Sequence, residues 1–363
     1  MLAMMVQTSD DILSLLEAKG AQAAKEAQRG VVLQPGALGD CILTLPLIKL
    51  MKNTLGLGGV DLVGHSDYIG ILPERSCVSS IRSIDSTELH RLFAEPAKFD
   101  LVDHDPLINT FADYAWIVTF LGEPNSNFEQ NLIFTSNCSH SAEIITLSLK
   151  PPEEAKQHVA EYYIQQFARQ SGLPLDQIGI AAGERLIKVT QADRERGLEL
   201  LDQMGIDVSS KLVVLHPGSG GRHKCWHIDN FLGIAKTLRS MDFEVLFLLG
   251  PAETERFSGD DKARLSDTAR CASHLPLSQV VDLLACTDAV VGNDSGVTHL
   301  AAGMGLRTFA MFGPTDPAQY RPIGPALTVL QDTQERFTQQ PNPDLQKVVV
   351  EGITAPPQKP TTP

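Results

Sequence analysis

Short apolar runs alternate with longer helical patterns along most of the 363-residue chain. This alternation is typical of an α/β protein with parallel sheets, and it constrains the fold more than any other feature. In the first half we expect strands at 31–34, 61–65, 81–84, 101–103, 116–121 and 144–149, and helices at 44–52 and 152–170. In the second half we expect strands at 212–215, 245–249, 289–291 and 308–311, and helices at 228–240, 254–265 and 277–286.

The alternation is interrupted by two stretches that break regular structure, SGLP at 171–174 and the segment 179–183, which place a domain boundary near residue 180. We therefore expect an N-terminal extension over 1–29 and two Rossmann-like doubly wound domains over 30–180 and 181–331. A proline-rich tail over 332–363 is expected to be partly disordered. Two such domains would face each other across a central cleft, with the ligand at the carboxyl ends of the strands.

The charge balance narrows the range of partners. The chain has 30 Lys and Arg against 44 Asp and Glu, a net charge of −14, which disfavours broad nucleic-acid binding because that requires clustered cations. Asp10 and Asp11 interrupt the apolar start, so we expect no signal peptide. No apolar run approaches the ~20 residues of a membrane helix. Six cysteines without a CxxC pair indicate neither a disulfide framework nor a zinc site. We expect a cytoplasmic protein with at most peripheral membrane contact.

The first candidate loop follows strand 31–34 and reads PGALGD over 35–40. Gly36 and Gly39 allow a tight turn and a close approach of the backbone to a ligand, since neither carries a Cβ. Asp40 is then expected near a helix N-terminus at the mouth of the cleft. Two interpretations stay open: Asp40 takes a proton from a substrate, or it only caps the helix, which aspartate does well.

The second loop, HPGSGGRHKCW over 216–226, also follows a strand. Gly218 and its neighbouring glycines expose backbone N–H groups, and Ser219 offers a hydroxyl. Arg222 and Lys224 add positive charge, and this combination favours an anion such as a phosphate. The spacing is not that of a P-loop. A solvated turn is the alternative, and Trp226 is expected to pack in the core.

The third loop, GNDSGVTHLAAG over 292–303, follows strand 289–291. We expect Asp294, Ser295 and Gly296 to begin a helix whose first amides bind a diphosphate, with His299 in its first turns. The alternative is structural, with Asp294 as the N-cap and His299 as a core residue. Together, the three loops place an acid in one half of the chain and two phosphate-type loops in the other.

At these residues the chain resembles glycosyltransferase family 9, the ADP-heptose:lipopolysaccharide heptosyltransferases, over about residues 30–331. The motifs that carry the resemblance are PGALGD (35–40), HPGSGGRHKCW (216–226) and GNDSGVTHLAAGMGLRTFAMFGPTDP (292–317). The resemblance implies a GT-B fold with an N-terminal acceptor domain and a C-terminal nucleotide-sugar domain. It implies inverting transfer of a heptose from ADP-heptose without a metal or other cofactor. It also implies Asp40 as the catalytic base and a set of donor-binding residues, namely Ser219, Lys224, Asp294, Ser295, Gly296 and His299.

The resemblance is uneven outside these motifs. The family places a glutamate on the nucleotide ribose after strand 245–249, and here Glu253 is preferred over Glu255. His227 stands where the family has proline, and the segments 1–29 and 65–140 match nothing closely. The implied acceptor is a lipid-linked saccharide, the inner core of lipopolysaccharide at the cytoplasmic face of the inner membrane. Another surface polysaccharide fits the residues equally well.

Three alternatives remain. The sequence Asp103-His-Asp105 has the DxD pattern that holds a metal–diphosphate in other glycosyltransferases, but it lies in the half without phosphate loops, so we expect no metal site. A GT-B-like sugar-nucleotide epimerase or hydrolase would use the same diphosphate cleft. A noncatalytic sugar-nucleotide binding protein would keep the pocket but would not need the acid at Asp40. Nothing in the sequence predicts the oligomeric state.

Overall fold

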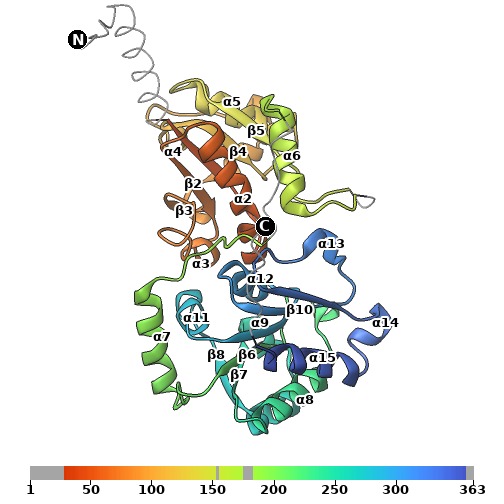
Figure 1. Cartoon of the computed structure of the whole chain (residues 1–363). Coiled ribbons are helices and arrows are strands. Elements are labelled where there is room, and N and C mark those ends of the chain that lie inside the picture. Colours follow the sequence, from red (N-terminus) through yellow and green to blue (C-terminus); the bar gives the residue numbers. More distant parts are fainter. Residues whose placement is uncertain (1–27, 153–154, 175–182, 357–363) are drawn as a thin grey trace, which may run out of the picture.

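The computed structural model describes residues 28–152, 155–174 and 183–356. It consists of two α/β domains, one above the other (Figure 1), each built on a parallel sheet with helices packed against it. Apolar clusters lie on both faces of each sheet. The predicted α/β class with two doubly wound domains is therefore confirmed. The predicted boundary near residue 180 and most of the extension over 1–29 lie outside the described residues.

The N-terminal sheet has the strand order β3-β2-β1-β4-β5. Its strands are β1 (Arg29–Leu33), β2 (Gly59–Gly64), β3 (Ile81–Ser83), β4 (Tyr114–Thr119) and β5 (Glu143–Thr146). Around it lie α2 (Leu38–Thr54), α3 (Ser66–Ile69), α4 (Pro106–Phe111), α5 (Asn127–Asn137) and α6 (Val159–Ser171), with 3-10 turns η1 (Ile84–Ser86), η2 (Leu89–Phe93) and η3 (Pro96–Lys98). The connections change direction between β1 and β4, which places the loop 34–40 at the switch point of the sheet, where doubly wound folds bind ligands.

The C-terminal sheet has the order β11-β10-β9-β6-β7-β8. Its strands are β6 (Leu212–His216), β7 (Glu244–Leu249), β8 (Arg270–Ser273), β9 (Ala289–Asn293), β10 (Arg307–Phe312) and β11 (Leu327–Gln331). Its helices are α7 (Gln191–Gln203), α8 (Ile228–Arg239), α9 (Pro251–Arg256), α10 (Gly259–Thr268), α11 (Leu277–Leu284), α12 (Gly296–Gly303), α13 (Pro317–Tyr320), α14 (Gln334–Phe337) and α15 (Pro343–Thr354), with the 3-10 turn η5 (Arg222–Lys224). The switch point lies between β6 and β9, where the second and third loops begin.

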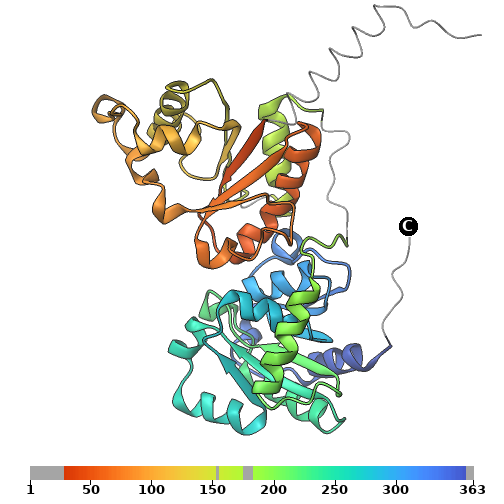
Figure 2. The ribbon, with the colours of Figure 1, turned by 90° about the vertical axis from the view of Figure 1, so that its left-hand side faces the viewer.

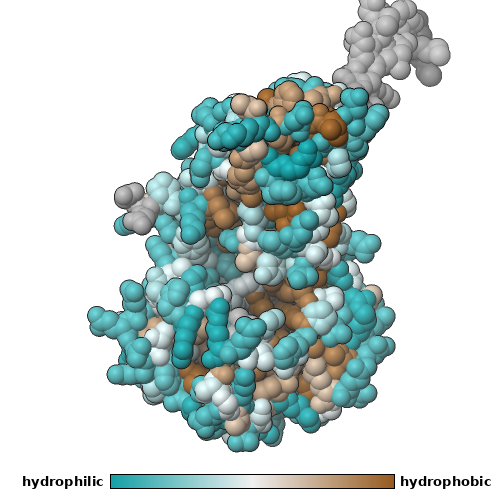
Figure 3. Space-filling view, turned by 180° about the vertical axis from the view of Figure 1, so that it is seen from behind, coloured by the Kyte–Doolittle hydropathy of each residue, from teal (hydrophilic) through white to brown (hydrophobic). Residues whose placement is uncertain are grey.

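The two domains share one continuous apolar cluster. It includes Ile42 of α2, Ile187 of the segment that leads into α7, and Leu300 of α12, all fully buried. Figures 1 and 2 show α2 lying directly above the C-terminal domain at this junction. In the space-filling view from behind, most of the surface is hydrophilic, and several apolar patches lie near the middle of the molecule (Figure 3). The position of α2 relative to α12 is therefore fixed by packing.

Several predicted elements differ from the structure. No strand forms at 101–103, where a turn leads into α4 and His104 has a φ of 61°. The helix predicted at 152–170 begins only at Val159, after the N-cap His158. The single helix predicted at 254–265 is divided into α9 and α10, because Ser258 caps a new helix. The elements that were not predicted are the strands β8 and β11 and the helices α3, α4, α5, α7, α13, α14 and α15.

We expected the C-terminal domain to end at residue 331 and a partly disordered tail to follow over 332–363, but the domain continues into the segment 332–356. The helices α14 and α15 lie within this segment, and Phe337, Val349 and Ile353 are buried in the core of the C-terminal domain. The proline-rich end that motivated the prediction, 357–363, lies outside the described residues. Among the described residues, no helix has the length and apolar character needed to span a membrane.

Candidate functional site

The N-termini of α2 and α12 face each other across the domain junction. A Cβ placed on Gly39 would lie 3.4 Å from Cδ2 of His299, and one placed on Gly296 would lie 2.8 Å from Cβ of Leu38. A side chain at position 296 would therefore force α2 and α12 apart. The loops that begin the two helices meet at this point, as expected for a site between the domains.

Asp40 is the third residue of α2. Its Oδ2 accepts a hydrogen bond from the N–H of Ala37 at 3.0 Å, so Ala37 is the N-cap and Asp40 completes the start of the helix. A Cβ on Gly36 would lie 2.6 Å from Oδ2 of Asp40, so a side chain there would displace the carboxylate. Burial raises the pKa of Asp40, against the opposing influence of the Ala37 N–H and of His299 in the other domain. Asp40 therefore both completes the N-terminus of α2 and lies at the junction of the two domains.

Asp294 connects the two phosphate-type loops. Nζ of Lys224 lies 2.9 Å from its Oδ2, and the hydroxyl of Ser219 donates to its carbonyl oxygen at 2.6 Å. The hydroxyl of Thr315 donates to the same Oδ2 at 3.0 Å, and Nε2 of His299 lies 3.5 Å from Oδ1. Burial alone would raise the pKa of Asp294, but the contacts with His299 and Lys224 hold it at about 2. Asp294 is therefore a buried anion that orients a lysine and a histidine.

The predicted alternative in which Asp294 caps α12 is wrong. The N-cap is Ser295, whose Oγ accepts a hydrogen bond from the N–H of Thr298 at 3.3 Å. His299 is buried, with 4% of its surface exposed, and its Nδ1 has no hydrogen-bond partner within the part of the chain that the structure describes. Its ring nevertheless lies against Gly39 of the other domain. His299 therefore belongs both to the core of its domain and to the junction.

Asn293, at the end of β9, holds the second loop in place. Its Nδ2 donates to the carbonyl oxygens of Pro217 at 2.8 Å and Gly218 at 3.3 Å, and its Oδ1 accepts from the N–H of Trp226 at 2.9 Å. Trp226 is 2% exposed and its ring packs edge-on against Phe231, which confirms its packing role. Sequence reasoning missed Asn293, because an asparagine in a Gly-rich loop looks like any turn residue.

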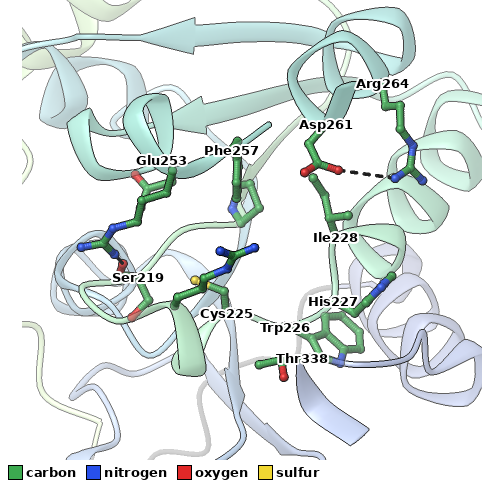
Figure 4. Close-up of a pocket in the computed structure, with 13 residues that line it drawn as sticks. Ser219, Cys225, Trp226, His227, Ile228, Glu253, Phe257, Asp261, Arg264 and Thr338 are labelled. Atoms are coloured by element: carbon green, nitrogen blue, oxygen red, sulfur yellow. Dashed lines mark hydrogen bonds and ion pairs between the residues drawn. The ribbon is translucent and has the colours of Figure 1, made fainter. Parts of the chain in front are cut away.

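A cavity of about 260 Å³ opens beside the second loop in the C-terminal domain (Figure 4). Glu253 lies in its wall, and its Oε2 accepts a hydrogen bond from the N–H of Gly250 at 2.8 Å. A Cβ on Gly218 would lie 2.0 Å from Cδ of Glu253, so the glycine makes room for this side chain. Glu255 is exposed and does not line the cavity. The other lining residues are Pro217, Ser219, Arg222, Cys225, Trp226, His227, Ile228, Arg256, Phe257, Asp261, Arg264 and Thr338.

Further contacts near the site were not predicted. Arg256 donates to the carbonyl oxygens of Ser219 at 3.2 Å and Gly220 at 3.1 Å, which orders the second loop from its outer side. Burial raises the pKa of Tyr320, which lies within the electrostatic reach of Lys224 and Asp40. His227, where the resembled family has proline, caps α8 through Nδ1, which accepts from the N–H of Asp229 at 3.3 Å.

The DxD sequence does not form a free pair of carboxylates. Asp105 is 1% exposed, and its oxygens accept hydrogen bonds from the Arg91 guanidinium at 2.9 and 2.8 Å and from the N–H of Leu107 at 3.0 Å. Asp103 is exposed in the preceding turn. Within the described ranges, no group of three or more His, Cys, Asp or Glu is arranged to hold a metal ion. Asp105 therefore closes a turn and caps α4.

The sequence profile of glycosyltransferase family 9 (heptosyltransferase) matches residues 134–348. Lipopolysaccharide heptosyltransferase 3 of Escherichia coli K12 is 22% identical over 295 residues, which cover 78% of this chain and 82% of that protein. Lipooligosaccharide heptosyltransferase 2 of Haemophilus influenzae is 30% identical over 115 residues, 30% of this chain and 33% of that protein.

Solved structures agree with the fold. The ADP-heptose lipopolysaccharide heptosyltransferase II of E. coli superposes with a TM-score of 0.64 at 16% identity, over 90% of this chain and 98% of that one. A family 9 glycosyltransferase from Veillonella parvula superposes with a TM-score of 0.62 at 16% identity, over 84% and 86% of the two chains. The two parallel-sheet domains form a GT-B fold, as the resemblance implied. Because the family profile matches more than half of its length, the chain belongs to glycosyltransferase family 9.

Proposed function

We propose that this glycosyltransferase moves a heptose from ADP-heptose to a saccharide of the lipopolysaccharide core, with inversion at the anomeric carbon. The observation that carries the proposal is the position of Asp40 in the first turn of α2, next to Gly39, which lies against His299 of the other domain. The charges of His299, Lys224 and Asp294 in that domain also act on the pKa of Asp40. The names of the similar proteins support the substrates: several are lipopolysaccharide heptosyltransferases, and one E. coli heptosyltransferase was solved with ADP.

On the donor side, the diphosphate would lie at the N-terminus of α12, beside Lys224. A helix N-terminus presents free N–H groups and a partial positive charge, and the lysine adds a full charge. Negative charge grows on the leaving diphosphate as the glycosidic bond breaks, so these groups stabilise the transition state more than the ground state. The cavity beside Glu253 would accept the nucleoside, with the buried carboxylate toward the ribose hydroxyls.

On the acceptor side, Asp40 would take the proton of the attacking hydroxyl. An alcohol is a weak nucleophile near neutral pH, and a positioned carboxylate that removes its proton speeds the step. Burial raises the pKa of Asp40 and so makes it a stronger base than an exposed aspartate. Closure of the cleft would bring the anomeric carbon to the acceptor oxygen near Asp40.

The cations already present give a route to charge stabilisation without a metal ion. Lys224 and the α12 N-terminus supply positive charge of the kind that a metal ion would otherwise bring to the diphosphate, so we propose metal-independent transfer. The acceptor is proposed to be lipid-linked and to meet the protein at the cytoplasmic face of the inner membrane through peripheral contact. A related surface glycan would use the same chemistry.

One incubation separates this function from its alternatives. Purified full-length protein is mixed with ADP-heptose, with and without a lipopolysaccharide core acceptor, and released ADP and glycosylated acceptor are measured. Release that requires the acceptor supports transfer; release without acceptor indicates a hydrolase, and isomerised donor an epimerase. Binding of ADP-heptose without turnover indicates a noncatalytic binder. Full transfer in EDTA is expected, and its abolition by chelation would overturn metal independence.

A further inference from the structure

A buried ion pair joins the two domains on the side of the segment that links them. Arg75 lies in the turn after α3, in the N-terminal domain, and Asp193 lies in the first turn of α7, in the C-terminal domain. The guanidinium donates from Nε to Oδ2 of Asp193 at 3.1 Å and from Nη2 to Oδ1 at 2.5 Å. The side chain of Asp193 is 0% exposed and that of Arg75 is 18% exposed. Two parallel hydrogen bonds of this kind fix orientation as well as distance.

The turn that carries Arg75 is fastened to α2, the helix whose first turn holds the catalytic candidate Asp40. Sγ of Cys77 donates to the carbonyl oxygen of Leu45 in α2 at 3.4 Å. Glu74 has a φ of 66°, which makes the turn tight, and Nη1 of Arg75 donates to the carbonyl oxygen of Ile71 at 3.3 Å. A displacement of Arg75 is therefore transmitted to α2.

Asp193 is held equally firmly in the C-terminal domain. Arg196 donates to Asp193 at 2.7 Å and to both oxygens of Asp282 in α11 at 3.0 and 2.8 Å. Gly197 lies so close to α11 that a Cβ there would be 2.1 Å from the carbonyl oxygen of Asp282. The chain of contacts thus runs from α2 through Arg75 and Asp193 to α11.

The segment 186–188, which leads into α7, is hydrogen-bonded to both domains. The N–H of Lys188 donates to the carbonyl oxygen of Arg75 at 2.6 Å, and the N–H groups of Leu186 and Ile187 both donate to the carbonyl oxygen of Gly303 at 3.0 Å. Gly303 is the last residue of α12, whose first turn meets α2. Rotation of one domain against the other would therefore strain the contact between Arg75 and Asp193.

We infer that Arg75 and Asp193 are positioning residues for transfer, because their ion pair sets the distance between Asp40 and the donor loops of the other domain. The inference rests on the proposed function for its catalytic consequence, but not for its geometry. Burial alone would raise the pKa of Asp193, yet the hydrogen bonds from Arg75 and Thr190 hold it at about 2, so the pair stays charged at every pH at which the protein would be assayed. No ligand residue of the donor site takes part in the pair.

The test compares Arg75→Met with the wild type in the full chain. We expect kcat to fall by about 10²-fold, the cost of misplacing a reacting group by about 1 Å, while the affinity for ADP stays within about twofold because the donor loops lie in one domain. Hydrogen exchange of the amides at 186–188 should accelerate, since both of their acceptors, the carbonyl oxygens of Gly303 and Arg75, lie at the junction. Arg75→Lys keeps the charge but loses the second hydrogen bond. Its kcat and its exchange rates at 186–188 should lie between those of the wild type and those of Arg75→Met.

Arg91→Met is the matched control. Arg91 makes a similar two-bond contact with the buried Asp105, but both residues lie in the N-terminal domain. We expect it to lower the melting temperature without a change in kcat or in exchange at 186–188. The inference is overturned when Arg75→Met behaves in the same way, losing stability alone. If Arg75→Met does not fold, Arg75→Lys carries the test with the same readouts. A wild type that transfers no heptose would refute the proposed function, while exchange at 186–188 would still decide the geometric part.

Discussion

Gly39 of α2 lies against the imidazole of His299 in α12, so the first turns of two helices from different domains meet at one point. Each helix brings a partial positive charge of about half a unit to that point. The combined field favours an ionised Asp40 and a diphosphate in the same small space. The buried carboxylate of Asp294, 2.9 Å from Nζ of Lys224, balances part of this positive charge within the protein.

Replacement of Asp40 by Asn tests the base. Asn removes the proton acceptor but can still accept the hydrogen bond from the Ala37 N–H, so the helix start is preserved. We expect kcat to fall by about 10²–10⁴-fold, with donor affinity unchanged. The control is Asp85→Asn, an exposed carboxylate of the same domain. An Asp40→Asn protein with most of its kcat would leave Asp40 with a capping role only.

Replacement of Lys224 by Ala tests the leaving-group contact. The variant loses the cation that we place beside the diphosphate, and we expect kcat/KM to fall by about 10²-fold, as for other single stabilising donors in active sites. Lys236→Ala, an exposed lysine in α8, serves as the control and should behave as the wild type. Steady-state assays of both variants suffice, and normal turnover by Lys224→Ala would remove the lysine from the mechanism.

The pH dependence of transfer should report Asp40. Because burial raises its pKa above the ordinary 3.8, the carboxylate loses its charge at a higher pH than an exposed aspartate, and kcat/KM should decline on that acid side. Lys224 lowers this pKa, so the acid limb should move to higher pH in Lys224→Met. Profiles of kcat/KM against pH for the two proteins decide this. An acid limb at the same pH in Lys224→Met as in the wild type would show that Lys224 does not influence the ionisation that the limb reports.

Asn293 should matter for binding although it is fully buried. Asn293→Leu leaves the carbonyl oxygen of Pro217 and the N–H of Trp226 without partners, at a cost of about 1–3 kcal/mol for each buried group. We expect a lower melting temperature and weaker ADP binding, measured by calorimetry. Asn293→Asp keeps the acceptor for Trp226 but turns a buried carboxylate oxygen toward the carbonyl oxygens of Pro217 and Gly218, so it should lower the melting temperature as well. Asn137→Leu, at an exposed position in α5, is the control, and equal ADP affinity in Asn293→Leu would refute the role.

His158 makes the junction sensitive to acid. Its Nδ1 accepts from the N–H of Ala160, and its Nε2 lies 2.9 Å from the carbonyl oxygen of Arg321 in the other domain. Burial lowers its pKa from 6.5 to about 4, so between these values the unfolded chain binds more protons than the native one. The free energy of unfolding should therefore drop by up to about 3 kcal/mol from pH 6.5 to pH 4. Denaturant titrations should show a shallower drop in His158→Asn than in the exposed-site control His90→Asn.

Local patterns predicted the fold well where strands are apolar. The central strands of both sheets are runs such as Val31–Leu33 and Val213–Leu215, which are buried on both faces and are read easily from sequence. β8 escaped prediction because Arg270 and Ser273 interrupt its apolar character, and β11 is an edge strand with two exposed residues. The run at 101–103 is apolar enough for a strand, but the hydrogen bonds of Asp105 terminate the segment in a turn.

The site was predictable where its chemistry is local. The three loops carry their glycines, hydroxyls and charges within a few residues, and each follows a strand, so the meeting of Asp40 with Asp294 and Lys224 was expected from topology. Contacts between distant segments left no such pattern. Arg75 and Asp193 are separated by 118 residues, and neither stands in a motif. Asn293 acts through the carbonyl groups of another loop, which no sequence pattern reveals.

The three hydrogen bonds of the Asn293 amide are all made to backbone groups of the protein itself. The second loop is therefore ordered when the domain folds, and donor binding does not have to supply the free energy of ordering it. The stability of the C-terminal domain and its affinity for nucleotide are therefore linked. A solution condition that loosens the C-terminal domain lowers its affinity for nucleotide, and nucleotide in return raises its melting temperature by an amount set by its own concentration.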